Sequence, residues 1–518
     1  MSGKTIFNSV KMTKPNRNKF DLTHDVKMSC KMGKLYPTML LECIPGDKFN
    51  IGADSLIRLA PLVSPMMHRC DVTIHYFFVP HRLLWDNWEK YITNTPLEGT
   101  QLLPAFPTVD LDTSNASLRS LADYLGIPTA RVGFNEYVSA LPFAAYQKIY
   151  NEYYRDQNLS PEVDDNLVDG DNTSNSELFE LRYRAWEHDY FTAALPFAQK
   201  GAAVDIPLGQ VELNPEAEGV TPGLWKKYDI YNPTNTSQLP SDGNIKIETG
   251  TWPAFTKDDT DYPITYDPNG TLQVEPTTIN DLRRAFKLQE WLEKSARGGS
   301  RYIENILAFF GVKSSDARLQ RPEYITGVKS PIIVSEVVQN SETNTSPQGN
   351  LAGHSVSVNQ GTFGGYYCEE HGYIMGIVSI LPKTAYFQGI ERTWLKTKSP
   401  FDFFWPQFAN IGEQEVYNRE LYAFVDQEEG DATFGYVPRY AEYKFMNNRV
   451  AGDFRDNLDF WHMARKFATA PALNQQFIEA NPTDRVFAVN NGDDNVYCHI
   501  LNKVTASRLM PVYGTPTF

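Results

Sequence analysis

Four possible metal ligands lie close together in the first part of the chain: His68, Cys70, His75 and His81. Imidazole and thiolate groups at such intervals can bind zinc. However, His75 lies in a run that alternates like a strand, and no C-x-x-C or H-E-x-x-H pattern accompanies the group. We therefore predict neither a metal site nor a cofactor.

A second group, Glu369-Glu370-His371, places two carboxylates beside an imidazole, a combination suited to general acid–base catalysis. Adjacent side chains of a strand point to opposite faces, so the three groups do not converge without a bulge. With Trp225 and Trp252 as sugar-stacking surfaces, they leave one alternative open, a β-sandwich protein that binds or hydrolyses glycans.

Other catalytic signatures are missing from the sequence. It contains no G-x-x-x-x-G-K-[ST] loop and no G-x-G-x-x-G after a strand, and His354-Ser355 lacks the G-x-S-x-G elbow. Gly298-Gly299 is explained by the end of a helix. The prediction from these motifs is a protein that is not an enzyme.

The elements that position these residues are predicted to be mainly short strands, separated by Gly, Pro, Asn and Asp. Strands spread over the whole length favour one β-sandwich or barrel with large insertions over alternating βαβ units. The predicted strands are Met39–Cys43, Val72–Val79, Pro331–Val338, Ser355–Val358, Tyr373–Leu381 and Val496–Val504.

Helices are predicted in the connections. The clearest spans Ile279–Ser295, with Thr278 as N-cap and an apolar stripe that indicates a buried face. A second amphipathic run, Tyr302–Phe310, ends at a glycine. The stretches Leu83–Tyr91 and Tyr137–Tyr154 are also predicted to be helical.

Composition limits the class of protein. The chain has 518 residues, and 48 Lys and Arg against 63 Asp and Glu give a net charge of −15, which disfavours a generic nucleic-acid binder. Five cysteines scattered from Cys30 to Cys498 form no disulfide framework and favour a reducing compartment. No apolar run approaches the roughly 18 residues of a membrane helix, and the start lacks an apolar signal region, so we expect neither membrane insertion nor the usual export.

The first 34 residues carry the opposite charge to the rest of the chain. Only Asp21 and Asp25 oppose eight basic residues, leaving +6. We predict an extended arm that touches DNA phosphates, with a solvated tail as the alternative. The candidate DNA-binding residues are Lys4, Lys11, Lys14, Arg17, Lys19, Lys27, Lys31 and Lys34.

Two segments are acidic. The first, Ser160–Glu180, is predicted to be a surface loop. The second, Asp205–Glu275, has 12 acidic residues against four lysines and many prolines, yet it is too rich in aromatic residues for a disordered linker. It is predicted to be a folded protrusion of short strands. Its candidate receptor-facing residues are Trp225, Tyr228, Tyr231, Trp252, Phe255 and Tyr262.

Aromatic residues make up 13% of the chain, which suits extensive protein–protein contact. Segments such as Phe401–Pro406 and Tyr436–Phe445 are predicted to be ordered loops that serve assembly.

A collinear series of short motifs resembles the major capsid proteins of the Microviridae, small icosahedral single-stranded-DNA phages, and their gokushovirus-like branch in particular. Each motif is modest, but the ordered set spans nearly the whole chain. The motifs are Pro45-Gly46-Asp47, Leu56-Ile57-Arg58, Pro65-Met66-Met67, Tyr76–Pro80, Arg82–Trp85, Arg297–Tyr302, Asp316–Tyr324, Phe404-Trp405-Pro406, Gly412-Glu413-Gln414, Arg449–Arg455 and Pro511–Pro516.

The resemblance implies an eight-stranded viral jelly-roll β-sandwich with long, partly helical insertions, self-assembly into a T=1 shell around circular single-stranded DNA, and no enzymatic activity. It implies an interior arm (1–34), a core in two parts (35–204 and 276–518) and a threefold spike (205–275) that meets a host-surface receptor. Expected partners from the same phage are a small basic DNA-binding protein, a scaffolding protein and a pilot protein. The expected location is the virion, assembled in the bacterial host cytoplasm.

Overall fold

A computed structural model describes residues 16–99, 101–131, 134, 136–202, 204–205, 278–338, 351–361, 363–489 and 492–513, and five short strands between 211 and 274. The chain forms two compact units, one of Met1–Ala198 with Ser295–Phe518 and the other of Gln199–Lys294. Among the described residues, no helix is long and apolar enough to cross a membrane.

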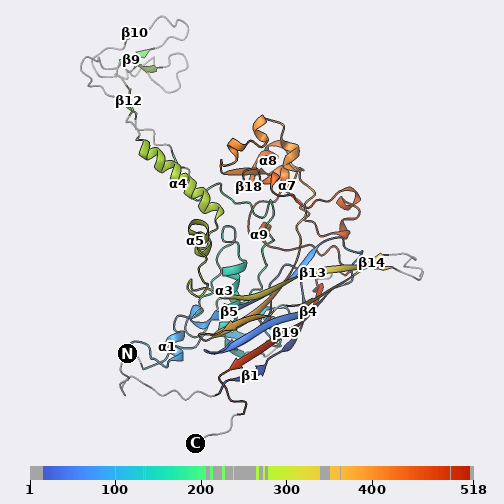
Figure 1. The fold of residues 1–518 in the computed structure, drawn as a ribbon. Coiled ribbons are helices and arrows are strands. Elements are labelled where there is room, and N and C mark those ends of the chain that lie inside the picture. Colours follow the sequence, from blue (N-terminus) through green and yellow to red (C-terminus); the bar gives the residue numbers. More distant parts are fainter. Residues whose placement is uncertain are drawn as a thin grey trace, which may run out of the picture. The chain divides into compact units, whose positions relative to one another are not determined.

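The centre of the first unit is a curled antiparallel sheet (Figure 1). Its main path runs through eight strands in the order β1-β19-β4-β14-β13-β5-β16-β3, while β2 and β15 pair with β19 and β4 beside it. The strands are β1 (Asn18–Asp21), β2 (His24–Cys30), β3 (Tyr36–Cys43), β4 (Lys48–Leu59), β5 (Cys70–Pro80), β13 (Glu323–Val338), β14 (Leu351–Gln360), β15 (Gly364–Tyr367), β16 (Gly372–Pro382) and β19 (Val496–Arg508).

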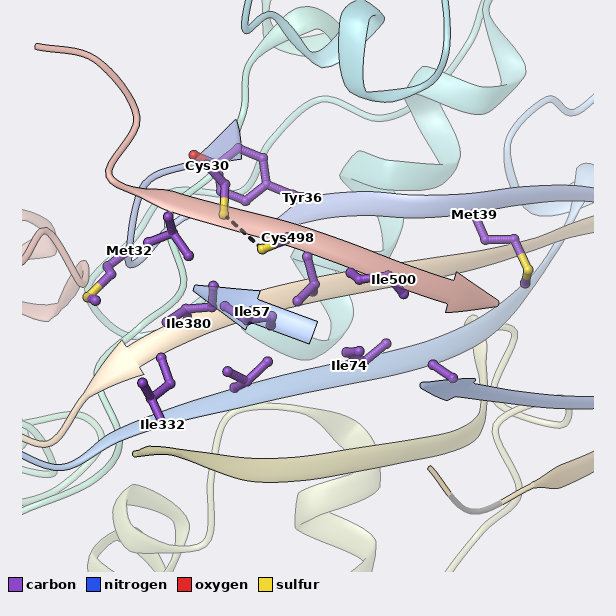
Figure 2. Close-up of a cluster of buried hydrophobic side chains, with 14 of the residues drawn as sticks. Cys30, Met32, Tyr36, Met39, Ile57, Ile74, Ile332, Ile380, Cys498 and Ile500 are labelled. Carbon is purple, nitrogen blue, oxygen red and sulfur yellow. Dashed lines mark hydrogen bonds between the residues drawn. The ribbon is translucent and has the colours of Figure 1, made fainter. Parts of the chain in front are cut away.

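The sheet folds over so that two of its parts face each other across one core. Ile57 of β4 and Ile500 of β19 are buried opposite Ile74 of β5 and Ile380 of β16 (Figure 2). Alternating burial along β4 and β19 places every second side chain in this core. The fold is therefore the mainly β, jelly-roll β-sandwich with insertions that the sequence predicted, and all six predicted strands are present.

The outer side of the β3-β16-β5 part is covered by the helix α3 (Leu141–Ile149), which lies beside β5 in Figure 1. Phe143 and Tyr146 of α3 pack in a second core with Phe77 and Met375 of the sheet. The predicted helix Tyr137–Tyr154 is thus shorter than expected. Its first residues belong to β7 (Glu136–Ser139), which pairs with β6 (Thr108–Leu111), and its end is a π-helical turn.

The predicted helix Leu83–Tyr91 is broken. A 3₁₀ turn at His81–Leu83 and the short helix α1 (Trp88–Ile92) are separated by Leu84–Asn87. Trp85 is buried, and its indole Nε1–H and the Asn87 amide both donate to Asp169 Oδ1, at 2.7 and 3.0 Å. These bonds hold the segment in its packed, non-helical course.

The acidic loop Ser160–Glu180 is less exposed than predicted. Asp165 is buried, where it accepts hydrogen bonds from Lys148 at 3.1 Å and Asn151 at 2.8 Å. Burial raises the pKa of Asp165 although Lys148 lowers it. Part of the acidic charge therefore holds this loop onto the core of the first unit.

A four-charge network of Asp71, Glu187, Lys329 and Lys383 ties β5, β13 and the end of β16 together. Asp71 lies 3.0 Å from each lysine Nζ, and Glu187 contacts both lysines. Burial alone would raise the pKa of both acids, but the lysines hold their pKa values below the usual ones. The network therefore links these strands by ion pairs across the sheet.

The second unit contains the predicted short strands: β8 (Val211–Leu213), β9 (Leu224–Lys227), β10 (Ser237–Gln238), β11 (Ile264–Asp267) and β12 (Leu272–Val274). Strands β10, β9 and β11 form one small sheet, and β12 pairs with β8 in another.

The helix α4 (Ile279–Arg297) follows these strands and begins as predicted, since the Asp281 amide donates to Thr278 Oγ1 at 3.2 Å. Its apolar stripe is not buried as expected, because Ile279 and Phe286 are exposed. Leu282 and Leu292 of the same stripe are half-buried.

The remaining described elements are short. They are α2 (Leu121–Tyr124), α5 (Tyr302–Phe310), α6 (Arg392–Leu395), β17 (Glu413–Tyr417), α7 (Asn418–Leu421), α8 (Gln427–Asp431), β18 (Thr433–Pro438) and α9 (Gln475–Ile478).

Candidate functional site

Short elements between α6 and β18 form a loop-rich subdomain in the first unit. Strands β17 and β18 pair, and Val416, Leu421, Phe434 and Val437 are buried in a small core beneath them. This core fixes the backbone of the surrounding loops, so their exposed side chains have defined positions.

Between Ile390 and Met446, around this core, the chain carries many exposed apolar side chains, which we call the aromatic surface. Patches of this kind mark sites of protein–protein contact. It includes the rings of Phe401–Pro406 and further residues that the sequence did not single out. Of the predicted loop Tyr436–Phe445, only Tyr443 and Phe445 belong to it, because Tyr436–Pro438 lies in β18 and Tyr440 is buried. Its members are Ile390, Trp394, Phe401, Phe403, Phe404, Trp405, Ile411, Phe424, Tyr443, Phe445 and Met446.

A buried ion pair anchors the aromatic surface. Lys396 Nζ lies 2.9 Å from Glu442 Oε1, and each side chain is only 6% exposed. The same Lys396 Nζ lies 3.8 Å from the centre of the Tyr443 ring, and Gln414 donates to Glu442 at 2.7 Å. Burial raises the pKa of Glu442, but the Gln414 amide and the Lys396 ammonium hold it below its usual value. The loop at Lys396, the strand β17 and the 3₁₀ turn at Ala441–Tyr443 are thereby fixed at one point.

The helix α5 carries a second exposed apolar face. Tyr302, Leu307 and Phe310 are each more than half exposed. The helix ends as predicted at Gly311, whose φ of 68° is left-handed and whose amide donates to Leu307 O at 3.0 Å. No residue of α5 is fully buried within the described part of the chain.

Five of the candidate DNA-binding residues are described, and the segment is not an extended arm there, because β1 and β2 pair with β19. Lys19 and Lys27 are exposed, and Lys27 pairs with Asp25 at 3.3 Å. Arg17 donates to the carbonyl oxygens of Ser507 and Gly46. These three residues therefore lie on or beside the sheet.

Lys31 and Lys34 are half-buried. Lys34 Nζ lies 5.1 Å from the Tyr183 ring centre, and burial together with nearby Lys31 lowers the pKa of Lys34. Lys4, Lys11 and Lys14 lie outside the described residues.

Of the candidate receptor-facing residues, Trp225 belongs to β9. Tyr228, Tyr231, Trp252, Phe255 and Tyr262 lie outside the described residues.

Several of the groups considered for metal binding or catalysis have structural partners. His75 contacts Tyr154 Oη at 2.8 Å, and His68 contacts Lys383 O at 2.5 Å. Glu370 accepts two hydrogen bonds from Arg82, at 2.6 and 3.0 Å. Within the described ranges, no three His, Cys, Asp or Glu side chains are grouped as metal ligands.

A pocket of ≈ 720 Å³ in the first unit has arginines in its lining, including Arg184, Arg297 and Arg301. Arg184 donates to the hydroxyls of Thr73 and Ser379, whereas Arg297 and Arg301 pair with Glu413 and Glu304. These three arginines therefore make their polar contacts within the fold.

The chain is similar to phage capsid proteins along nearly its whole length. Residues 8–518 match the family model described as Capsid protein (F protein). Capsid protein VP1 of Chlamydia phage 1 is 35% identical over 584 residues, covering 99% of this chain and 97% of that protein. Capsid protein VP1 of Bdellovibrio phage phiMH2K is 38% identical over 525 residues (96% and 95%), and that of Spiroplasma virus 4 is 31% identical over 537 residues (96% and 95%).

Proposed function

Because the chain belongs to the Capsid protein (F protein) family and is a structural capsid protein of phage virions, we propose that its copies form a T=1 icosahedral shell around circular single-stranded DNA. In this proposal the protein acts by self-association and has no enzymatic activity. The observation that carries it is the aromatic surface, because contact between copies would remove these rings from water.

Electron microscopy of the expressed full-length chain tests the proposal, with closed shells as the expected result. Trp394 and Phe424 are 75% and 71% exposed, so the double variant Trp394→Ser, Phe424→Ser should fold but fail to form shells. A matched control is Leu118→Ser, Val168→Ser, which changes exposed residues elsewhere. Wild-type chains that remain monomeric under assembly conditions would contradict the shell, and normal shells from the Trp394 variant would contradict the interface.

The insertion at 205–275 is proposed to contact a host-surface receptor. Its short strands pair only with one another among the described strands, which supports a separable module. Deleting Val211–Gln273 should therefore leave shell formation intact and abolish adsorption of particles to host cells. Adsorption equal to that of intact particles would remove this role.

The first 34 residues are proposed to face the interior and bind DNA phosphates. Replacing Lys11, Lys14, Arg17 and Lys19 with Ala should weaken DNA binding uniformly over sequence and reduce its salt dependence. An unchanged salt dependence would show that this segment does not contact phosphates. So few positive charges cannot neutralise most of the genome phosphates, and we propose that a small basic protein supplies the remaining cations. We further propose that a scaffolding protein acts in assembly and a pilot protein in delivery.

A further inference from the structure

On one side of the sandwich, the described residues leave the sheet exposed. The residues of β4 and β19 that alternate with the core residues point outward, and Lys48, Asn50, Arg58 and Tyr497 are exposed. The opposite side of the sandwich carries α3 and its core. We call the outward side of β1, β2, β19, β4, β14 and β15 the open sheet face.

The open sheet face is basic although the chain is acidic. The strand register places five basic and three acidic residues on it, which leaves an excess of two positive charges, in a chain whose net charge is −15. His354 and His499 add two imidazoles. The basic residues are Lys19, Lys27, Lys48, Arg58 and Lys503, and the acidic ones are Asp21, Asp25 and Asp54.

The charges differ in availability. Asp25 and Asp54 are engaged by Lys27 and Lys503, respectively. No ion pair is recorded within the described ranges for Lys19, Lys48 or Arg58, so these three provide cationic groups for an incoming anion.

Three half-exposed rings lie among these cations. Lys48 Nζ is 5.8 Å from the centre of the Tyr367 ring, and Lys503 Nζ is 5.9 Å from that of Phe363. Tyr497 is the direct cross-strand neighbour of Arg58. All three rings are 50–53% exposed, so they keep free area for stacking.

The ring of Phe363 lies over Gly52 of β4. A Cβ added to Gly52 would be only 3.1 Å from Phe363 Cδ1, so a glycine at this position lets the ring lie close to the sheet. Tyr497 is six residues along β19 from Lys503, the neighbour of Gly52 beneath Phe363, which is roughly 20 Å at the rise of a strand. Gly52 is four residues along β4 from Lys48, the neighbour of Tyr367, which is roughly 13 Å. Each ring can therefore take a different base of one strand.

We propose that the open sheet face binds single-stranded DNA, with bases stacked on Phe363, Tyr367 and Tyr497 and phosphates held by Lys19, Lys48 and Arg58. Alternating rings and cations on an uncovered sheet suit an unpaired strand, because stacking and charge act together without sequence readout. This inference rests on the proposed enclosure of such DNA and places the open sheet face on the inner side of the shell.

Two sets of variants in the unassembled full-length chain test the inference. The ring set is Phe363→Leu, Tyr367→Leu, Tyr497→Leu, which keeps apolar bulk and the fold. The cation set is Lys19→Gln, Lys48→Gln, Arg58→Gln. Matched controls change exposed residues outside the open sheet face. The controls are Tyr137→Leu, Phe286→Leu, Phe310→Leu for the rings and Lys90→Gln, Lys313→Gln, Lys466→Gln for the cations.

Binding is measured with an oligothymidylate of about 30 nucleotides and an abasic oligomer with the same number of phosphates. The ring set should weaken oligothymidylate binding by roughly 5- to 150-fold per lost stack and leave abasic binding unchanged. The cation set should weaken both and reduce the magnitude of the log–log salt slope by about 2. Ring and cation sets that behave like their controls would overturn the inference.

Electron microscopy of the same variants separates this inference from the shell itself. Shells from the ring set with weakened DNA binding support the inference. Loss of shells with unchanged oligothymidylate binding would overturn it, because the open sheet face would then be a contact between copies. Wild-type chains that form no shell contradict the proposed function whatever the oligonucleotides show.

Discussion

The buried pair of Lys396 and Glu442 allows a quantitative prediction. Lys396→Met preserves much of the side-chain volume but leaves the Glu442 carboxylate buried with only Gln414 as a partner. Breaking a buried ion pair on one side costs about 3–5 kcal/mol. The opposite change, Glu442→Gln, should cost less, because the ammonium keeps the Tyr443 ring at 3.8 Å and such a contact is worth about 0.5–2 kcal/mol.

The sign of the pH dependence follows from the lowered pKa of Glu442. A carboxyl with a lowered folded pKa stabilises the fold above its unfolded pKa of about 4.3, and this contribution is lost as pH falls through the folded pKa. In Lys396→Met the unpaired carboxyl is relieved by protonation instead. The difference between variant and wild type should therefore be largest near neutral pH and shrink towards about pH 4.

Hydrogen exchange in β17 and β18 measures the effect where it arises, because these strands belong to the same subdomain. At neutral pH, amide protection in Lys396→Met should fall by about 2 to 4 powers of ten relative to wild type. Glu442→Gln is the internal comparison. Equal losses in the two variants, or a difference that grows on acidification, would refute the reasoning.

Three further predictions concern the body of the subunit. Gly33→Ala should prevent folding or lower the free energy of unfolding by more than about 4 kcal/mol, because φ is +91° and the added Cβ would lie 1.7 Å from a carbonyl oxygen. The control Gly126→Ala, at φ +96° with open space around it, should lower the free energy of unfolding by only about 1 kcal/mol, as measured by thermal unfolding. Acidification below about pH 4 should lower the melting temperature less in the double variant Asp71→Asn, Glu187→Gln than in wild type. The reason is that both carboxylates, whose pKa values are lowered in the fold, stabilise it only above that pH range. Equal losses of melting temperature would contradict this. All five cysteines should resist a thiol reagent until denaturant is added, because they are buried and burial raises the pKa of Cys70 to about 12; fast labelling of the native chain would be inconsistent with this packing.

The strands that the sequence predicted best are those with strong local patterns. Val72–Val79 and Tyr373–Leu381 are nearly continuous apolar runs because both of their faces are buried, one in the sandwich and one under α3. By contrast, β4 was missed because a polar Ser55 at an inward position and an apolar Leu56 at an outward one interrupt its alternation. Its outward side, which carries the open sheet face, became visible only with the register.

Helical periodicity shows which face of a helix is apolar but not what covers it. The apolar stripe of Ile279–Ser295 was recognised, yet Phe286 is exposed in the subunit. Tyr137–Ser139 was assigned to a helix because its pairing partner is about 30 residues earlier, beyond any local pattern. The aromatic surface was partly predicted, since the composition indicated assembly, whereas Trp394 and Phe424 stand outside any motif and needed the packed loops to reveal them.

The position of β19 affects how the protein is synthesised. This last strand of the chain lies between β4 and the N-terminal strands β1 and β2, and its Val496 and Ile500 are part of the main core. Before β19 has been made, the strands that pair with it have no neighbour on that side, so the sandwich closes only once Val496–Arg508 is present. Unfinished or prematurely terminated polypeptides thus lack a completed core. Folding of the sandwich thus depends on pairing between strands far apart in the sequence, β19 with β1 and β2.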